Sequence, residues 1–243
     1  MIKNQYRFFV GKECFQGNYL LVKDKNTVHQ IKKVLRLKVG QQIVLLDNSG
    51  FEYLVSLEKI DNQVEGRLLE KKMNKNEPAR KIVLCQSLLK HDKFEEVLKF
   101  STNLGVHSFM PFVSENSIVQ EINPHKLERC YKIIQESAEQ AERGILPKLE
   151  RTMNLNESLE FLKDKNNLKL VGWEQEKEKK LIDFTQEINQ SEKIYLIIGP
   201  EGGFTSEEIN LAKRVGCLTF SLGRLVLRAE IAGLVSGALI LNL

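Results

Sequence analysis

The sequence predicts an α/β protein in which a small β-rich module precedes a larger domain with a mostly parallel sheet. Residues 1–70 contain short β-type segments separated by turn signals such as Asn48-Ser49-Gly50. From Arg80 onward, apolar strands alternate with helical segments, which is typical of parallel strands with helices on both faces. Residues 71–79 include two asparagines and Pro78, as linkers often do. We therefore expect one domain over residues 1–72 and another over 79–243.

The N-terminal module is expected to be a small β-barrel. One helix is predicted over Asn26–Leu37, because apolar residues recur there at helical spacing. The predicted strands are Tyr6–Val10, Gln42–Asp47, Phe51–Leu57 and Gln63–Leu68.

The larger domain is expected to alternate strand and helix to its end. Its predicted strands are Lys81–Leu89, His107–Val113, Leu168–Trp173, Ile194–Ile198 and Cys217–Phe220. Helices are expected over Asp92–Leu104 and Pro124–Arg143, from a cap at Asn156 to Lys163, from Thr205 onward, and at the C-terminal end. Thr205 and Glu208 have the spacing of a capping box. The charged segment Glu174–Lys180 is expected at the surface.

The composition argues against several classes of protein. A hydrophobic content of 42% is typical of a globular chain with a core, not of a disordered one. The four cysteines include no CxxC pair, so we expect no metal site and no disulfides. Isolated cysteines are typical of proteins in a reducing cytoplasm, which is the location we expect. No long apolar segment begins the chain, so we expect no secretory signal. The longest apolar stretch, Ile231–Leu243, is shorter than the roughly 20 residues that span a membrane.

The net charge of +4 is unevenly distributed. Residues 1–75 carry 14 Lys/Arg against 8 Asp/Glu, whereas the rest of the chain carries 22 against 24. Much of the excess lies between Lys23 and Lys38, where it would attract a polyanion such as nucleic acid. From charge alone, a lysine-rich surface that only aids solubility is the alternative.

Two glycine-bearing loops near the C-terminus are the strongest functional signal. Gly199-Pro200-Glu201-Gly202-Gly203-Phe204 follows the apolar run 194–198, and Leu222-Gly223-Arg224 follows the segment 217–221. Each loop leads from a strand to a helix, and open α/β sheets bind ligands at such carboxyl ends. Glycines let a ligand lie on the main chain because no Cβ intervenes. Tight turns that merely connect strand to helix are the alternative.

The residue types in these loops restrict the chemical class of the ligand. The first loop matches neither GxGxxG nor the Walker A pattern, and the carboxylate of Glu201 would repel a phosphate. The same carboxylate suits a cationic or hydrogen-bond-donating ligand. Beyond the second loop, Arg228 and Glu230 begin an apolar helix. The helix dipole explains Glu230 but disfavours Arg228, which is therefore a candidate for a functional or interface role.

The segments GPEGGFTSEE and LGRLVLRAEIA resemble the C-terminal signature of the RsmE family, the 16S rRNA (uridine-N3) methyltransferases of the SPOUT superfamily. The resemblance extends along the chain. It includes Tyr6–Val10, His29 with Val34–Gly40, Lys90, Asp92, Lys93, Leu104–Val106, Glu136, Ala138–Gln140 and Arg143.

This resemblance implies a PUA-like barrel followed by a SPOUT α/β domain with a C-terminal trefoil knot. It implies a cytoplasmic homodimer whose active sites draw on both subunits, with S-adenosyl-L-methionine as cofactor and neither metal nor membrane. The methyl acceptor would be N3 of a uridine in 16S rRNA, within the assembled small ribosomal subunit.

The resemblance also implies roles for particular residues. The cofactor would be bound by Ile198, Gly199, Pro200, Glu201, Gly203, Leu222, Gly223 and Leu227. Arg228 would stabilise the anionic imide, and Glu230 would accept a proton or hold Arg228. Glu201 would bind a cofactor amine or the partner subunit. RNA would be bound by Arg7, His29, Lys32, Lys33 and Arg36 in the barrel, and by Lys90, Lys93 and Arg143 in the catalytic domain.

Three alternatives stay open. Leu225 stands where the family usually has arginine, and Ile231 where it has threonine, so a ribosome-assembly factor without activity is one alternative. Methyl transfer to another RNA, such as tRNA, is the second. The third is a nucleotide-binding α/β enzyme that acts on small molecules, which the basic N-terminal module disfavours.

Overall fold

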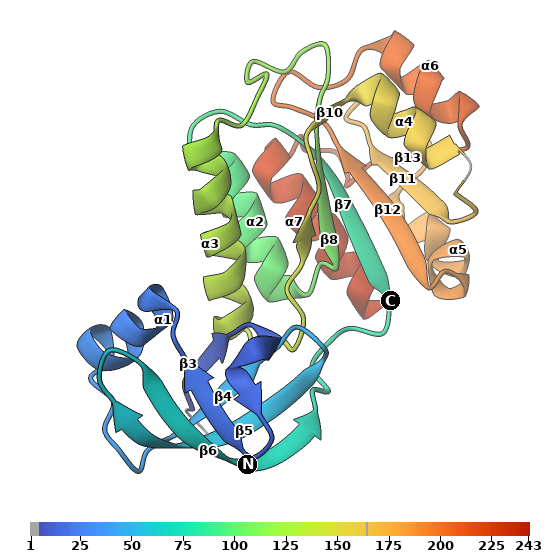
Figure 1. Ribbon diagram of the computed structural model, residues 1–243. Helices are drawn as coiled ribbons and strands as arrows, with labels where there is room; N and C mark the ends of the chain where they lie inside the picture. The colour runs from blue at the N-terminus through green and yellow to red at the C-terminus, as the bar shows by residue number, and fades with distance from the viewer. Residues whose placement is uncertain (1–4, 164) are drawn as a thin grey trace. The chain divides into compact units, whose positions relative to one another are not determined.

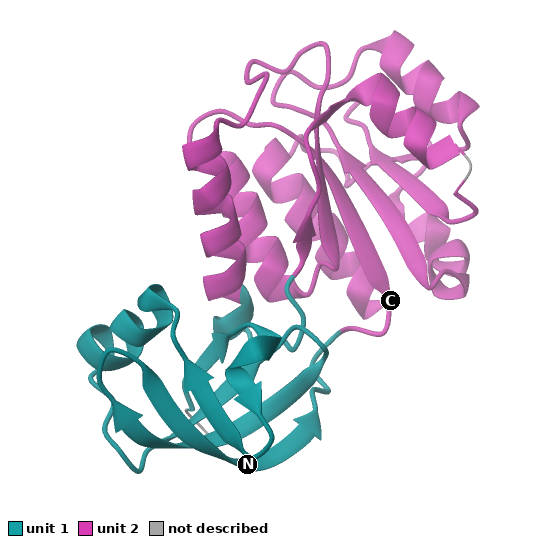
Figure 2. Ribbon diagram, viewed as in Figure 1, with its two compact units in different colours: residues 1–77, 138–146 teal, residues 78–137, 147–243 magenta. Residues whose placement is uncertain are grey.

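The computed structural model describes residues 5–163 and 165–243, and the chain divides into two compact units. Unit 1 comprises residues 1–77 and 138–146, and unit 2 comprises residues 78–137 and 147–243 (Figure 2). The chain therefore returns to unit 1 at the end of a long helix before it continues in unit 2.

Unit 1 contains a mixed sheet with strand order β1-β4-β5-β6-β3-β2. The strands are β1 (Arg7–Phe9), β2 (Phe15–Gln16), β3 (Tyr19–Val22), β4 (Gln42–Leu46), β5 (Phe51–Ile60) and β6 (Val64–Met73). β1 pairs in parallel with β4, and the other neighbours are antiparallel. The four predicted strands correspond to β1, β4, β5 and β6. Asn48 and Gly50 adopt positive φ in the turn that the sequence predicted between β4 and β5.

Both faces of β4 are buried, which explains why residues 138–146 belong to unit 1. Ile43 and Leu45 pack in the main core of the unit, together with Phe8 of β1. Val44 and Leu46 point to the other face. There they pack in a second cluster with Phe9, Ala138 and Leu146.

The predicted helix over residues 26–37 is shorter and irregular in the structure. A 3-10 turn, η1 (Lys12–Cys14), comes earlier in the chain, and α1 (Lys25–His29) continues into a π-helical segment, η2 (Gln30–Val34). Arg36 then adopts a φ of 52°, in the left-handed region where a helix cannot continue. The end of the basic segment is therefore a turn and not one face of a helix.

Unit 2 is an α/β domain with a parallel sheet (Figure 1). The strand order is β10-β8-β7-β12-β11-β13, with β9 paired to β8. The strands are β7 (Lys81–Ser87), β8 (Ser108–Val113), β9 (Lys148–Leu149), β10 (Met153–Asn154), β11 (Leu168–Gly172), β12 (Lys193–Ile198) and β13 (Leu218–Phe220). All the pairings described are parallel, which confirms the prediction from strand–helix alternation.

Helices cover both faces of this sheet. They are α2 (Lys93–Leu104), α3 (Pro124–Gln140), α4 (Leu155–Lys163), η3 (Leu181–Phe184), α5 (Thr185–Gln190), α6 (Ser206–Arg214) and α7 (Ala229–Asn242). Leu84 and Leu196 pack with α2, α3, α5 and α7, whereas Val83 and Ile197 pack with α4 and α6. This division follows from the alternation of side chains along each strand. None of the helices in the described ranges is both long and apolar enough to cross a membrane.

Of the helix caps predicted at Thr205 and at Asn156, the first is confirmed by the structure and the second is wrong. Thr205 and Glu208 form the predicted capping box, with Thr205 N donating to Glu208 Oε2 (3.0 Å) and Glu208 N donating to Thr205 Oγ1 (3.3 Å). The predicted cap at Asn156 is wrong. α4 begins at Leu155, so Oδ1 of Asn154 accepts from N of Glu157 at 2.8 Å instead.

The last crossing of the chain brings the two glycine loops together. β13 lies at the edge of the sheet beside β11, whereas α7 packs on β12, β7 and α2. Residues 221–228, which connect β13 to α7, must therefore pass the carboxyl ends of β11 and β12. The second predicted loop consequently lies beside the first.

Candidate active site

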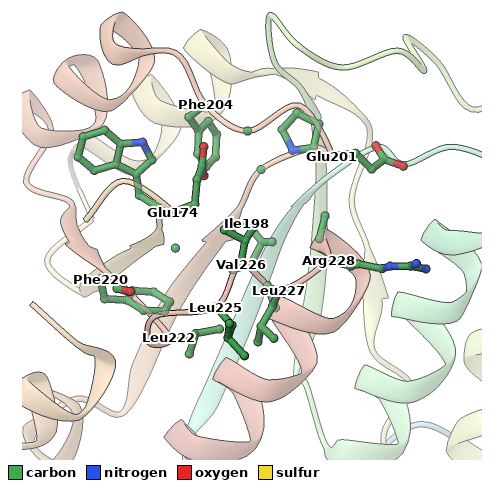
Figure 3. A pocket seen from close by; sticks show the side chains of 18 of the residues that line it. Glu174, Ile198, Glu201, Phe204, Phe220, Leu222, Leu225, Val226, Leu227 and Arg228 are labelled. Carbon is green, nitrogen blue, oxygen red and sulfur yellow. The ribbon is translucent and has the colours of Figure 1, made fainter. Parts of the chain in front are cut away.

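A cavity of about 420 Å³ lies at the carboxyl ends of β11, β12 and β13 (Figure 3). Its wall consists of residues 172–174, 198–204 and 220–229, completed by Lys93 of α2 and Ala232 of α7. The cavity lies entirely within unit 2. Its position is the one at which open parallel sheets bind ligands.

The structure brings the predicted cofactor-binding residues to this cavity. They line it together: Ile198, Gly199, Pro200, Glu201, Gly203, Leu222, Gly223 and Leu227. Arg228 also lines the cavity, and Glu230 lies beside it in the first turn of α7.

Sequence reasoning missed the third loop of the site. Trp173 and Glu174 follow β11 and line the cavity; Glu174 is exposed, as expected of the charged segment 174–180, but its place at the cavity was not predicted. β11 pairs with both β12 and β13, so its carboxyl end lies between the two predicted loops. Gly172 was the available signal, because it is a third glycine at the carboxyl end of an apolar strand.

Close packing explains the glycines of the first loop. A Cβ on Gly199 would lie 2.9 Å from the ring of Phe204. Gly203 has a φ of 69°, and a Cβ there would overlap the carboxylate of Glu174. The Phe204 ring is stacked with Phe112 of β8, with centroids 6.2 Å apart. The bare main chain of this loop is therefore fixed against the sheet where it lines the cavity.

Four charged side chains form a row at one side of the cavity. Lys93 Nζ lies 3.6 Å from Glu201 Oε1 and 3.5 Å from Glu230 Oε1. The same Glu230 oxygen lies 4.0 Å from Nη1 of Arg228. Figure 3 shows Glu201 and Arg228 on the side opposite Glu174 and Phe204. The charges alternate in sign along the row, so each carboxylate has a cation beside it.

Glu230 and Arg228 differ sharply in exposure. The Glu230 side chain is 10% exposed, and its Oε2 has no hydrogen-bond partner among the described residues. Buried polar atoms are rarely left without a partner, so this oxygen is a candidate acceptor for a substrate proton. The Arg228 side chain is 78% exposed. Its backbone caps α7, with its carbonyl accepting from the N–H of Ala232.

Glu201 is held in its ionised form at the rim of the cavity. Burial alone would raise its pKa, but hydrogen bonds from its own N–H and from Lys90 N (3.1 Å), together with the charge of Lys93, lower the pKa below its ordinary value. Glu201 therefore places an ionised carboxylate at the rim of the cavity, where it could meet a positively charged part of a ligand.

The predicted RNA-binding residues lie in different environments. His29, Lys33 and Arg36 are exposed, whereas Lys32 Nζ lies 3.2 Å from Oδ1 of Asp61. In unit 2, Lys93 belongs to the charged row, and Lys90 is half-buried beside Glu201.

Carboxylates inside unit 1 hold Arg7 and Arg143. Nη1 of Arg7 lies 2.7 Å from Oε1 of Glu52, and Nη2 of Arg143 lies 2.8 Å from Oε2 of Glu77. The Arg143 side chain is only 3% exposed, and it lies in unit 1, not with the rest of the predicted catalytic domain. The structure gives both arginines a stabilising role inside unit 1 in place of the exposed position that RNA contact requires.

The described residues contain no group of three His, Cys, Asp or Glu side chains arranged to hold a metal ion. The cysteines are unpaired and buried. Burial raises the pKa of Cys130 and of Cys217 to about 11. Thiols of this kind are inert packing groups and not nucleophiles.

Comparison with known proteins identifies the class to which this fold and cavity belong. The sequence profile of the RNA methyltransferase domain matches residues 75–241, and that of the RNA methyltransferase PUA domain matches residues 23–69. The N-terminal module is thus a PUA domain, and the parallel-sheet unit is an RNA methyltransferase domain.

Individual relatives narrow this class. Ribosomal RNA small subunit methyltransferase E of Mesomycoplasma hyopneumoniae is 33% identical over 232 residues, covering 94% of this chain and 96% of the relative. The Bacillus subtilis protein of that name is 29% identical over 214 residues, covering 85% and 84%. The crystal structure of such an enzyme from Neisseria gonorrhoeae, bound to S-adenosyl methionine, has a TM-score of 0.88 at 27% identity and covers 98% of both chains. The chain belongs to the ribosomal RNA small subunit methyltransferase E family.

Proposed function

We propose that this protein transfers a methyl group from S-adenosyl-L-methionine to N3 of a uridine in the 16S rRNA of the small ribosomal subunit. One observation carries the proposal: a glycine-lined cavity adjoins the charged row of Glu201, Lys93, Glu230 and Arg228. The cavity suits the cofactor, and the row suits deprotonation of a base. Membership in a family of rRNA methyltransferases supports the same reaction.

The residues of the cavity fit this cofactor. Main-chain groups would bind its adenine and methionine parts at Ile198, Gly199, Gly203, Leu222, Gly223 and Leu227. A Cβ on Gly199 or Gly203 would meet Phe204 or Glu174, so a side chain at either position would displace a residue that lines the cavity. Glu201 would offset positive charge on the cofactor. When bound, S-adenosyl-L-methionine supplies a methyl group on a sulfonium, which needs no acid activation.

Glu230 and Arg228 would act on the base. N3 of uracil carries a proton and is a weak nucleophile until that proton leaves. Oε2 of Glu230, buried and without a donor, would accept it. The guanidinium of Arg228 would stabilise the negative charge that develops on the imide. Lys93 would hold the Glu230 carboxylate through its other oxygen.

Unit 1 would supply most of the RNA contacts. His29, Lys33 and Arg36 are exposed within or next to the basic segment between Lys23 and Lys38. Such contacts would fix phosphates and position the RNA without reading its sequence. Lys90 would add a contact on unit 2. The target uridine must leave its stack to reach the cavity.

We further propose that the sheet of unit 1 closes into a PUA-like barrel, and that residues 1–72 and 79–243 are the functional domains. For the second domain we propose the trefoil knot of SPOUT proteins. The path of residues 221–228 past the ends of β11 and β12 supports the knot. In addition, Ser221 N donates to Lys179 O (2.9 Å) and Leu181 N donates to Ser221 O (3.2 Å), so this crossing is bonded to the segment after β11.

Two copies of the chain would form the working enzyme. Leu225 is 83% exposed, Val226 76% and Ile231 42%, and all three lie within three residues of Arg228 in the sequence. Exposed apolar side chains grouped in this way support an interface. A partner on this surface would complete each site and would also contact Glu201 or Arg228. A ribosomal substrate and unpaired cysteines further support a cytoplasmic location.

The test uses small ribosomal subunits from a strain that lacks the modification. We expect the purified protein and labelled S-adenosyl-L-methionine to produce 3-methyluridine, located in 16S rRNA by mass spectrometry. Arg228→Ala should bind the cofactor but transfer no label. Absence of both incorporation and cofactor binding would favour an assembly factor, and label in tRNA alone would favour another RNA substrate.

A further inference from the structure

Glu174 occupies a position in the cavity that the glycine motifs do not reveal. It lies two residues beyond Gly172, the end of β11, and β11 lies between β12 and β13. Its carboxylate is directly against the main chain of Gly203, because a Cβ on that glycine would overlap it. Figure 3 shows the side chain next to the cavity, on the side away from Glu201 and Arg228.

The carboxylate of Glu174 has no hydrogen-bond or ion-pair partner in the described ranges, 5–163 and 165–243. Two other acidic residues of unit 2 differ from it: Glu201 accepts from Lys90 N, and Glu176 accepts from Thr219 Oγ1 at 2.6 Å. A carboxylate that borders a cavity without a donor of its own suits a ligand that brings donors.

We propose that Glu174 binds the ribose 2′- and 3′-hydroxyls of the cofactor, a role that rests on the proposed function. The two oxygens of a carboxylate match the two donors of a cis-diol. An acidic residue beyond the end of a neighbouring parallel strand makes the same contact in dinucleotide-binding folds. The opposite side of the cavity already has Glu201 to meet positive charge, which leaves Glu174 for the neutral diol.

Trp173 allows ligand binding to be measured directly, so the proposal can be tested without an assay of methyl transfer. It is the single tryptophan of the chain and lines the same cavity, so its fluorescence reports occupancy. The probes are S-adenosylhomocysteine and 5′-methylthioadenosine; both have the ribose diol, but only the first has an ammonium group. The variants are Glu174→Ala and Glu174→Gln. Glu178→Ala, an exposed acid in the same loop, is the control.

We expect Glu174→Ala to lower the affinity for both probes by similar factors of about ten or more. Glu174→Gln should lower these affinities by less, and Glu178→Ala should leave them unchanged. A loss for S-adenosylhomocysteine alone would assign Glu174 to the ammonium and overturn the ribose contact. Unchanged affinities for both probes would overturn any role of Glu174 in binding. If the wild type bound neither probe, the proposed function itself would fail. A melting temperature equal to that of the wild type shows that a variant is folded. Glu174→Gln in addition keeps the shape of the side chain.

Discussion

The ammonium of Lys93 lies 3.5 Å from Oε1 of Glu230 and so joins the first turn of α2 to the first turn of α7. The other cation near Glu230 is Arg228, whose guanidinium is 4.0 Å away and largely in solvent. Burying a carboxylate without a close cation is strongly unfavourable. Lys93 is therefore the close cationic partner of Glu230 beside the cavity, and it fixes the orientation of that side chain.

Replacing Lys93 with methionine is expected to reduce kcat for methyl transfer at least tenfold, because Glu230 loses the cation that orients it. Lys93 also pairs with Glu201, so we expect a smaller loss of cofactor affinity. Lys93→Arg should retain most of the activity. Lys132→Met, on an exposed part of α3, is the matched control. If the Lys93→Met enzyme kept the full kcat, Lys93 would have no role in catalysis.

Gly203→Ala should weaken cofactor binding, because its new Cβ would displace the carboxylate of Glu174 at the cavity. The residue has a φ of 69°, and its new Cβ would overlap Glu174. Gly17 has a φ of 63° with nothing within 4 Å of an added Cβ, so Gly17→Ala carries the same backbone strain without the overlap. We expect both variants to lose about 1–2 kcal/mol of stability from that strain. Only Gly203→Ala should lose cofactor affinity, measured by calorimetric titration, and equal affinity in the two variants would show that this loop does not hold the cofactor.

Local patterns predicted the parts of the site that are continuous in sequence. Gly199 and Gly223 could be recognised because each follows an apolar strand, and the structure places both at one cavity. Trp173 and Glu174 were missed because nothing local states that β11 lies between β12 and β13. Strand order depends on how helices pack across the sheet, which a single sequence does not reveal.

Predictions that depend on distant partners were less accurate for the same reason. In the sequence, Arg7 and Arg143 look like any exposed cation. In the fold, Glu52, 45 residues from Arg7, and Glu77, 66 residues from Arg143, hold them inside unit 1. Charge counting correctly locates the basic excess, but it cannot separate paired arginines from exposed ones such as Arg36.

The stability of unit 1 should depend on pH through Glu52. Burial alone would raise its pKa, but the hydrogen bond and charge of Arg7, with Asn74 and Lys72, hold the pKa below its ordinary value of 4.5. A carboxyl whose pKa falls on folding contributes stability that is complete above its unfolded value and is lost as the pH falls through its folded value. The contribution of Glu52 should therefore be complete at neutral pH and decline below about pH 4.5.

Thermal unfolding followed by circular dichroism, from neutral pH down to about pH 3, checks this prediction. Glu52→Gln should lower the melting temperature at neutral pH, and the difference from the wild type should shrink as the pH falls. Glu70→Gln, an exposed carboxyl on β6, should change little at any pH. A difference between wild type and Glu52→Gln that stays constant with pH would contradict the assignment.

Arg36→Ala should weaken RNA binding while cofactor affinity stays unchanged. Arg36 is exposed in a basic turn of unit 1, and the cavity lies wholly in unit 2. Loss of one phosphate contact should reduce the slope of log affinity against log salt by about one. Arg36→Gly removes the same charge and suits the φ of 52°, whereas Lys12→Ala controls for charge elsewhere in the unit. An equal fall in cofactor affinity would refute the separation of the two sites.

Leu225→Asp is expected to convert the proposed homodimer to a monomer. Leu225 is 83% exposed in the segment that leads to Arg228, and a carboxylate placed in an apolar interface would be desolvated without a partner. Ile182→Asp places the same charge on another exposed apolar position, 54% exposed in η3, and should leave the dimer intact. Light scattering coupled to size-exclusion chromatography measures both masses. Because the proposed site draws on two subunits, Leu225→Asp should also lose methyl transfer; an active monomer would show that one chain completes the site by itself.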